Sequence, residues 1–345
     1  MRSRAWCTVL SVAVTAAILV AAPTAGADPA VVTEVTDFGA NPGDLQMFEY
    51  VPAGLPAGAP LVLFMHGCLT QVSNYDDETG WLQLAEQRKW AVVFPQQKVT
   101  NNNNLCLNWT SEEDIQRGSG EARSIVSMVE WMLQHHPLDP KRVYATGHSA
   151  GGYFTSVMLA TYPDVFAAGA EVSGGPYRCQ TAQPIYAAPP GVYVAPAMVV
   201  TEFSAREECT QAEIDKSPQQ WGDLLRSGDS TYTGAKPPIL LWHGAADATV
   251  KPKNFHELVE QWTNFHGIDL HPDRHAELAF GAYRYTHDSY SDNRGRLLVD
   301  TYLVDGADHP YAGDGSANCP GQANEGICTT RIIADWFEAR RATKP

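Results

Sequence analysis

The sequence predicts an α/β fold with a mostly parallel central sheet flanked by helices. After residue 45, short apolar runs alternate with stretches of helical periodicity, as happens when helices connect parallel strands. Several of these runs are hydrophobic throughout, as strands buried on both faces should be. Residues 120–135 carry an apolar stripe at helical spacing that can pack against the sheet. Its members are Ile125, Val126, Val129, Met132 and Leu133.

The expected elements follow this alternation along the chain. The expected strands are 46–51, 60–65, 90–95, 142–146, 168–172, 238–243 and 297–304. The expected helices are 81–89, 120–135, 150–162, 253–266 and 330–342. Two stretches fit neither pattern: 176–236 is rich in Pro, Tyr and Gly, and 267–295 in His, Asp and Tyr. We interpret both as loop insertions over the active site, above the carboxyl ends of the strands, where open α/β sheets bind ligands.

The first residues predict export. Arg2 and Arg4 form a positive start, an apolar run from Val9 to Ala22 follows, and Ala25-Gly26-Ala27 supplies small residues for cleavage. The apolar run is shorter than the roughly 20 residues that span a bilayer, so we do not expect a membrane anchor. We therefore expect a signal peptide at 1–27 and one secreted, extracellular domain at 28–345.

The net charge argues against several classes of binding partner. The chain has 24 basic and 39 acidic residues, a formal charge of −15, which becomes −17 once Arg2 and Arg4 leave with the signal. Such a charge argues against nucleic acid, anionic lipid or any polyanion as the partner. We expect a monomer with no membrane partner.

The cysteines predict disulfides. Of seven cysteines, Cys7 lies in the signal, and an even number in an exported chain favours disulfide bonds over metal ligands. Fifteen pairings are possible. We prefer the pairing of sequence neighbours, which closes the shortest loops: Cys68 with Cys106, Cys179 with Cys209, and Cys319 with Cys328. No Cys-x-x-Cys pair and no regular Cys/His spacing indicates zinc, so no metal site is expected.

A nucleophile motif lies between an expected strand and an expected helix. It reads Gly147-His148-Ser149-Ala150-Gly151. The glycines suit a sharp strand-to-helix turn on which larger neighbours would clash, and the helix amino terminus then faces the reaction. Ser149 is therefore the candidate nucleophile.

A serine hydroxyl needs a histidine to take its proton and a carboxylate to orient that histidine. Asp247 follows the apolar strand 238–243, and its alternative role is to cap a turn. His309 follows the last expected strand and is the candidate base. Asp308 is expected to be a loop residue, because neighbours in a chain rarely face each other as the hydrogen bond requires.

Two N–H donors should bind the oxyanion of the tetrahedral intermediate. One is expected on Ala150, directly after the nucleophile, and the other on Cys68, in the loop after the strand 60–65. A Cys68–Cys106 bond would then fix the oxyanion loop in place. His66 and His148 are assigned no proton transfer.

These motifs together resemble a known family. They are His66-Gly67-Cys68, Gly80-Trp81, Phe94-Pro95, Cys106-Leu107-Asn108-Trp109, Gly120-Glu121, Gly147-His148-Ser149-Ala150-Gly151-Gly152, Tyr162-Pro163-Asp164 and His243-Gly244-x-x-Asp247. In content and order, from about residue 45 to 311, the chain resembles the polyhydroxybutyrate depolymerase-like esterases of the α/β-hydrolase superfamily, which include feruloyl and acetyl xylan esterases. The resemblance implies a triad of Ser149, Asp247 and His309, an oxyanion donor at Cys68, and ester hydrolysis through an acyl-enzyme without metal or organic cofactor.

The chain also departs from the family pattern. The family often has Cys-Trp-Asn-Trp where this chain has Leu107 in the second position, and His309 is followed by Pro310-Tyr311 instead of the usual x-Trp. Trp109 remains as an aromatic that we expect to contact substrate. These differences affect the choice of substrate more than the chemistry.

Three functions fit the sequence. The leading one is a secreted serine carboxylic-ester hydrolase acting on an ester that can be polymeric: a polyhydroxyalkanoate, or feruloyl or acetyl esters of plant polysaccharide. A serine peptidase could use the same triad, but no family resemblance favours it. A non-catalytic binding protein on a hydrolase fold is the third, and the presence of all three catalytic residue types argues against it.

Overall fold

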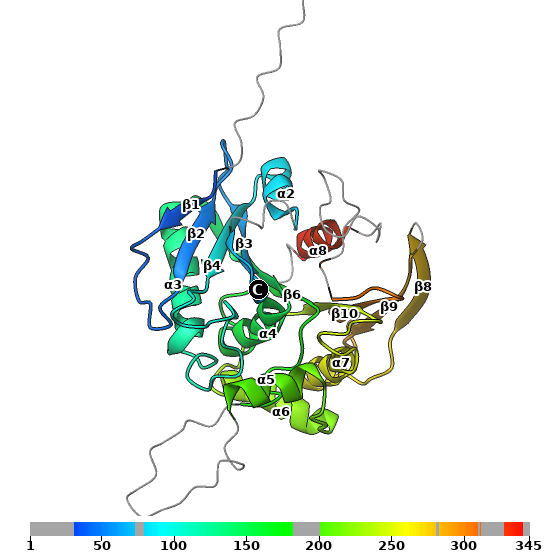
Figure 1. Cartoon of the computed structure of the whole chain (residues 1–345). Coiled ribbons are helices and arrows are strands. Elements are labelled where there is room, and N and C mark those ends of the chain that lie inside the picture. Colours follow the sequence, from blue (N-terminus) through cyan, green and yellow to red (C-terminus); the bar gives the residue numbers. More distant parts are fainter. Residues whose placement is uncertain are drawn as a thin grey trace, which may run out of the picture.

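A single mixed sheet organises the chain. The computed structural model describes residues 31–72, 79–181, 201–280, 283–309, 311 and 328–340. Ten strands of these residues are ordered β1-β2-β4-β3-β5-β6-β7-β10-β9-β8, with β1 and β8 at opposite ends (Figure 1). The strands from β4 to β10 in this order run parallel, and the outer pairs run antiparallel. This confirms the predicted mostly parallel central sheet.

Most of the expected elements are present with similar bounds. The strands are β1 (Thr33–Val35), β2 (Gln46–Tyr50), β3 (Ala59–Met65), β4 (Ala91–Gln96), β5 (Leu138–His148), β6 (Ala168–Val172), β7 (Ile239–Gly244), β8 (Arg274–Phe280), β9 (Tyr283–Ser291) and β10 (Leu297–Val304). The helices are α2 (Trp81–Arg88), α3 (Gly120–His135), α4 (Ala150–Thr161), α5 (Glu202–Thr210), α6 (Pro218–Gly228), α7 (Lys253–His266) and α8 (Thr329–Glu338). None of these helices is both long and apolar enough to cross a bilayer.

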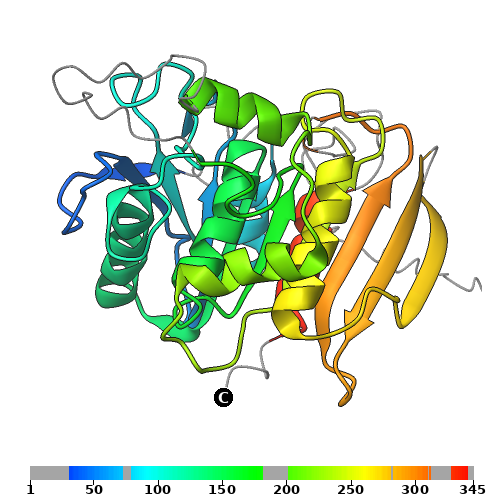
Figure 2. The same cartoon turned by 90° about the horizontal axis from the view of Figure 1, so that it is seen from below.

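Helices cover both faces of the sheet. Successive side chains of each strand point to opposite faces, so a hydrophobic core forms on each face. In β3, Leu61 and Leu63 pack into the cluster that contains side chains of α3, α4, α6 and α7. Val62 and Phe64 point the other way, into the cluster formed with α2 and α8. Figure 2 shows α4 and α7 in front of the sheet and α8 behind it. Continuous apolar strands are therefore needed, because both faces are buried.

The two stretches predicted as loop insertions contain regular structure. Within 176–236, helices α5 and α6 form, and α6 begins with a capping box between Ser217 and Gln220 that is readable in the sequence. Within 267–295, β8 and β9 extend the sheet antiparallel to β10, so this stretch is not a loop. Most residues of these two strands are half-exposed or exposed, and both strands mix polar with apolar residues, so they lack the continuous apolar signal of the central strands.

A buried acid on β6 leads to a prediction about stability. Burial raises the pKa of Glu171 well above its ordinary value of 4.5. Its side chain is hydrogen-bonded to Ser156, and its Oε1 has no hydrogen-bond partner among the described residues. The folded chain thus holds a proton that the unfolded chain releases above pH 4.5, so this group lowers the free energy of unfolding as pH rises toward its folded pKa.

Glu171→Gln should therefore raise the free energy of unfolding at pH 7.5, because the amide is neutral at every pH and the folded state no longer has to hold a proton that the unfolded chain releases. The gain should shrink toward zero at pH 4.5, where the wild-type carboxyl is largely protonated in the folded state and half protonated in the unfolded state. Thermal unfolding followed by circular dichroism at the two pH values measures the difference. An equal effect of the substitution at both values would contradict this explanation.

Candidate active site

The candidate nucleophile lies on a strained turn between β5 and α4. Ser149 has φ 58° and ψ −119°, a conformation that is costly for a residue other than glycine. Its N–H donates to the carbonyl of Val172 at the end of β6, at 2.9 Å. This bond ties the turn to the neighbouring strand and holds the side chain at the carboxyl edge of the sheet.

Both glycines of the motif are required by close backbone contacts. A Cβ atom on Gly151 would lie 2.0 Å from the Met65 carbonyl oxygen, and one on Gly147 would lie 2.3 Å from the Gly151 carbonyl oxygen. No side chain fits at either position without moving the backbone. The spacing Gly-x-Ser-x-Gly therefore follows from how tightly the turn packs against β3.

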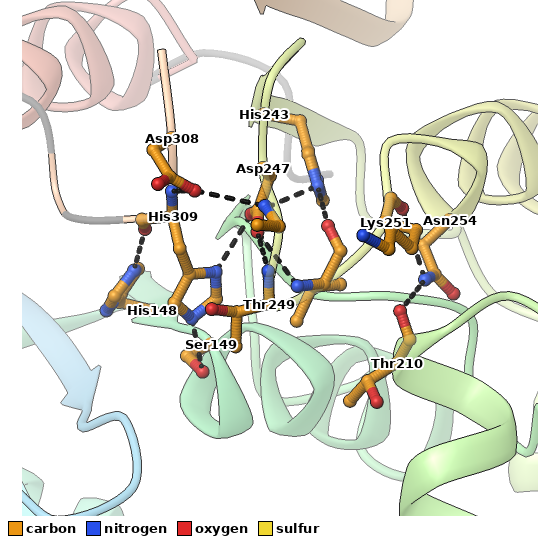
Figure 3. A network of polar contacts seen from close by, with 12 residues as sticks. His148, Ser149, Thr210, His243, Asp247, Thr249, Lys251, Asn254, Asp308 and His309 are labelled. Atoms are coloured by element: carbon orange, nitrogen blue, oxygen red, sulfur yellow. Dashed lines mark hydrogen bonds and ion pairs between the residues drawn. The ribbon is translucent and has the colours of Figure 1, made fainter.

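The structure brings together the three residues expected to form the triad. His309 Nε2 lies 2.9 Å from Ser149 Oγ, and His309 Nδ1 lies 2.8 Å from Asp247 Oδ2 (Figure 3). Because an ionised carboxylate only accepts, Nδ1 carries the proton and Nε2 is free to accept the serine proton. The three side chains follow β5, β7 and β10, whose carboxyl ends meet at one edge of the sheet.

Asp247 is held as a carboxylate by several donors. Its Oδ1 accepts from the N–H groups of Thr249 and Val250 at 2.9 and 2.8 Å, and His243 Nε2 lies 3.4 Å from Oδ2. Burial alone would raise the pKa of Asp247, but the hydrogen bond and charge of His309, the Val250 N–H and His243 together lower it. Asp247 therefore stays ionised at every pH above its ordinary value of 3.8.

Asp308 is a loop residue, as its position in the sequence indicated. Its Oδ1 accepts from the N–H of Ala248 at 3.0 Å and from the N–H of His309 at 2.8 Å. It thereby ties the loop that carries the histidine to the loop that carries the acid. No pattern in the sequence indicates this contact between segments 60 residues apart.

The loop after β3 passes beside the nucleophile. A Cβ atom on Gly67 would lie 3.3 Å from Ser149 Cβ, so the loop passes against the nucleophile at the residue before Cys68. Ala150 is the first residue of α4, where N–H groups have no partner within the helix. Ala150 and the residue before Cys68 thus lie next to Ser149, and the oxyanion role of the Ala150 and Cys68 N–H groups stays a prediction.

A buried carboxyl group joins the segments after β4, and the sequence analysis gave it no role beyond its place in the Gly120-Glu121 motif. Glu121, in the first turn of α3, is 0 % exposed and accepts from the N–H of Asn108 at 2.7 Å and from Gln97 Nε2 at 2.5 Å. Gln97 also donates its N–H to His66 Nε2 at 3.0 Å. The carboxyl group of Glu121 lies at the helix amino terminus, where the helix dipole favours an anion.

Burial keeps both histidines near the nucleophile neutral. Burial is the main cause that lowers the pKa of His66 to about 4 and that of His148 to about 3. Nδ1 of His66 lies 2.7 Å from the Gly67 carbonyl, to which it donates, and Nε2 of His148 lies 2.7 Å from the His309 carbonyl. Each of the two rings is therefore neutral and hydrogen-bonded to a backbone carbonyl, which agrees with the expectation that neither takes part in proton transfer.

Trp109 lies in the core. It is 5 % exposed and stacks on Tyr153 of α4, with ring centroids 3.9 Å apart and an interplanar angle of 9°. Through this contact Trp109 packs against α4, the helix that begins directly after Ser149. Its expected contact with substrate stays a prediction.

Two of the three expected disulfides are present. Cys68 is bonded to Cys106, and Cys179 to Cys209. Cys319 lies outside the described residues, as does the expected signal at 1–27. Within the described part of the chain, no three His, Cys, Asp or Glu side chains converge as metal ligands would.

Comparison with known proteins gives a consistent result. A family described as "Esterase PHB depolymerase" matches residues 45–183. Poly(3-hydroxyalkanoate) depolymerase C of Paucimonas lemoignei is 43 % identical over 307 residues, which cover 88 % of this chain and 68 % of that protein. Feruloyl esterase B of Thermothelomyces thermophilus is 34 % identical over a match that covers 69 % of this chain and 76 % of that protein.

The fold is also found among solved structures. The acetyl xylan esterase from Aspergillus awamori matches with a TM-score of 0.73 at 24 % identity, over 89 % of this chain and 99 % of that one. At this identity the match shows the fold, and it confirms the predicted α/β-hydrolase architecture.

Proposed function

Because the chain belongs to the PHB depolymerase family of esterases, we propose that it is a secreted serine hydrolase that acts through Ser149, His309 and Asp247. It is a carboxylic-ester hydrolase of the PHB depolymerase, feruloyl esterase and acetylxylan esterase type. The observation that carries the proposed mechanism is the continuous hydrogen-bond chain from Ser149 Oγ through the His309 ring to Asp247.

The geometry supports a two-step reaction. Ser149 Oγ attacks the ester carbonyl carbon while His309 Nε2 takes its proton, and the N–H groups of Cys68 and Ala150 bind the oxyanion. The intermediate collapses to an acyl-enzyme, and the alcohol leaves with the proton from His309. Water, activated by the same histidine, then attacks the acyl-enzyme and releases the acid and free Ser149. Asp247 stabilises the imidazolium in both steps.

The proposed substrate is an extracellular ester that can be polymeric. The relative with 43 % identity is named a poly(3-hydroxyalkanoate) depolymerase, which supports a polyhydroxyalkanoate as the first candidate. Feruloyl esters of plant polysaccharide are a second candidate, supported by the feruloyl esterase relative, and acetyl esters are a third, supported by an acetylxylan esterase relative with 31 % identity. The proposed removal of residues 1–27 would place the enzyme where such polymers occur.

A substrate panel tests this proposal. The purified mature protein should hydrolyse p-nitrophenyl acetate and butyrate, and at least one of dispersed polyhydroxybutyrate, methyl ferulate and acetylated xylan, with the best of the three naming the substrate class. Rates are followed by released nitrophenol or acid. If no ester of the panel is hydrolysed above the buffer rate, the proposed function is wrong.

The two disulfides should differ in their effect on catalysis. Replacing Cys68 and Cys106 by Ala together should lower the free energy of unfolding by roughly 3–4 kcal/mol, because the closed loop spans 38 residues. It should also lower kcat by about tenfold or more, since the loop that carries the Cys68 N–H is no longer fixed beside Ser149.

The Cys179–Cys209 pair is the matched control. Its loop spans 30 residues, so its removal should cost similar stability but change kcat much less. Chemical denaturation and steady-state rates on p-nitrophenyl butyrate, both at a temperature where all variants are folded, separate the two effects. Equal losses of kcat for both pairs would show that Cys68–Cys106 has no special link to the oxyanion site.

A further inference from the structure

One contact at the site has no part in the proton transfers described above. His148 is the residue before Ser149, at the end of β5, and its Nε2 lies 2.7 Å from the backbone carbonyl of His309 (Figure 3). Because a carbonyl oxygen only accepts, His148 Nε2 carries the proton and donates it. This side chain therefore connects the nucleophile strand to the backbone of the candidate base.

Packing holds the His148 ring between two loops of the site. Its ring centroid lies 4.9 Å from that of His309, and it meets the Tyr311 ring edge-on at 5.8 Å with an interplanar angle of 85°. A Cβ atom on Gly67 would lie 3.4 Å from His148 Nδ1. The His148 ring is thus held between Gly67, in the loop after β3, and His309 and Tyr311, in the loop after β10, called the His309 loop below.

The residues after β10 that carry His309 also make two contacts with the segment after β7, in addition to the contact of His309 Nε2 with Ser149 Oγ. Asp308 accepts from the N–H of Ala248, and the His309 ring donates to Asp247, so both contacts tie the loop to the segment after β7. Neither of them fixes the loop relative to β5, which leads into Ser149. The bond from His148 supplies that connection, from a residue covalently attached to the nucleophile.

We propose that His148 is a positioning residue that sets the distance between Ser149 Oγ and His309 Nε2. A shift of about 1 Å at a reacting pair can reduce a rate by about a hundredfold. His148 is the residue next to Ser149, and its Nε2–H donates to the His309 carbonyl. This bond limits such a shift, because the His309 backbone then moves together with β5. His148 also stays neutral while His309 becomes an imidazolium during turnover, since its burial disfavours a second positive charge.

Substitutions that keep or remove the donor test the proposal. His148→Leu removes the N–H, whereas His148→Gln places an amide N–H near the position of Nε2. We expect kcat on p-nitrophenyl butyrate to fall roughly 10- to 100-fold in the Leu variant with KM within about twofold, and the Gln variant to recover most of the loss. His148→Asn, whose amide is too short to reach the carbonyl, should behave like Leu and serves if the Leu variant does not fold.

A double-mutant cycle separates positioning from packing. Since His148 acts through His309, His148→Leu should leave the residual rate of His309→Ala unchanged within about twofold. An equal loss in both backgrounds would overturn the proposal, and so would a Gln variant no more active than Asn when both melt at the wild-type temperature.

The inference rests on the proposed triad, and the two fail in different ways. If His309→Ala keeps wild-type kcat, the triad itself is wrong. If His309→Ala loses activity but His148→Leu does not, the triad stands and the positioning role is refuted.

Discussion

Ser149→Ala is expected to lower kcat roughly 10⁵-fold while the protein stays folded. The alanine cannot form the acyl-enzyme, so only binding and the oxyanion donors remain to assist hydrolysis by water. Ser149 adopts φ 58° in the wild type, and alanine must adopt the same strained turn, so the thermal midpoint should change little. Initial rates at high enzyme concentration on p-nitrophenyl butyrate measure the residual activity.

Ser173 offers a matched control for this substitution. It is a buried serine just after β6, the strand beside β5, and it also has a left-handed backbone, with φ 50°. Ser173→Ala should keep activity within a few-fold of the wild type. A Ser149→Ala variant that retained a tenth of the wild-type kcat would exclude Ser149 as the nucleophile.

Asp247→Asn is expected to lower kcat about 10³- to 10⁴-fold. Asp247 accepts two backbone N–H groups on Oδ1 and the His309 Nδ1–H on Oδ2, and an amide can supply only one acceptor oxygen. With that oxygen facing the backbone donors, the NH₂ group faces His309 and forces the proton onto Nε2. The imidazole then points a proton at Ser149 and cannot accept one.

Asp308→Asn is the control for the acid, because the two aspartates lie in neighbouring loops. The amide of this variant would still present an oxygen to the N–H groups of Ala248 and His309, so we expect kcat to remain within about tenfold of the wild type. Steady-state kinetics of both variants on the same ester make the comparison. The reverse order of effects would assign the catalytic acid to position 308.

The sequence predicted the parts of this structure whose physics is local or repetitive. The central strands are short runs in which most residues are apolar or small, so β3, β6, β7 and β10 could be located within a residue or two. The candidate triad could be found because parallel strands bring their carboxyl ends to one edge, and each of its residues directly follows a strand or lies in the loop after it.

Other features depend on contacts that leave no pattern in a sequence. The edge strands β8 and β9 mix polar with apolar residues, and their pairing is decided by the free edge of β10. Glu121 is buried because amide groups from separate segments converge on it, and His148 contacts a carbonyl 161 residues away. Such roles follow from tertiary packing, whereas Ser217-Pro218 at the start of α6 was a local signal that could have been used.

The central claim, that Ser149 is the nucleophile of an acyl-transfer reaction, is tested most directly by covalent trapping. The mature protein is treated with a fluorophosphonate, digested, and the modified peptide is sequenced by mass spectrometry, with Ser149→Ala as the control. The mechanism predicts one adduct per chain, on Ser149, which forms far more slowly in His309→Ala because Oγ has lost its base. No adduct, or an adduct on another residue with Ser149 unmodified, would contradict it.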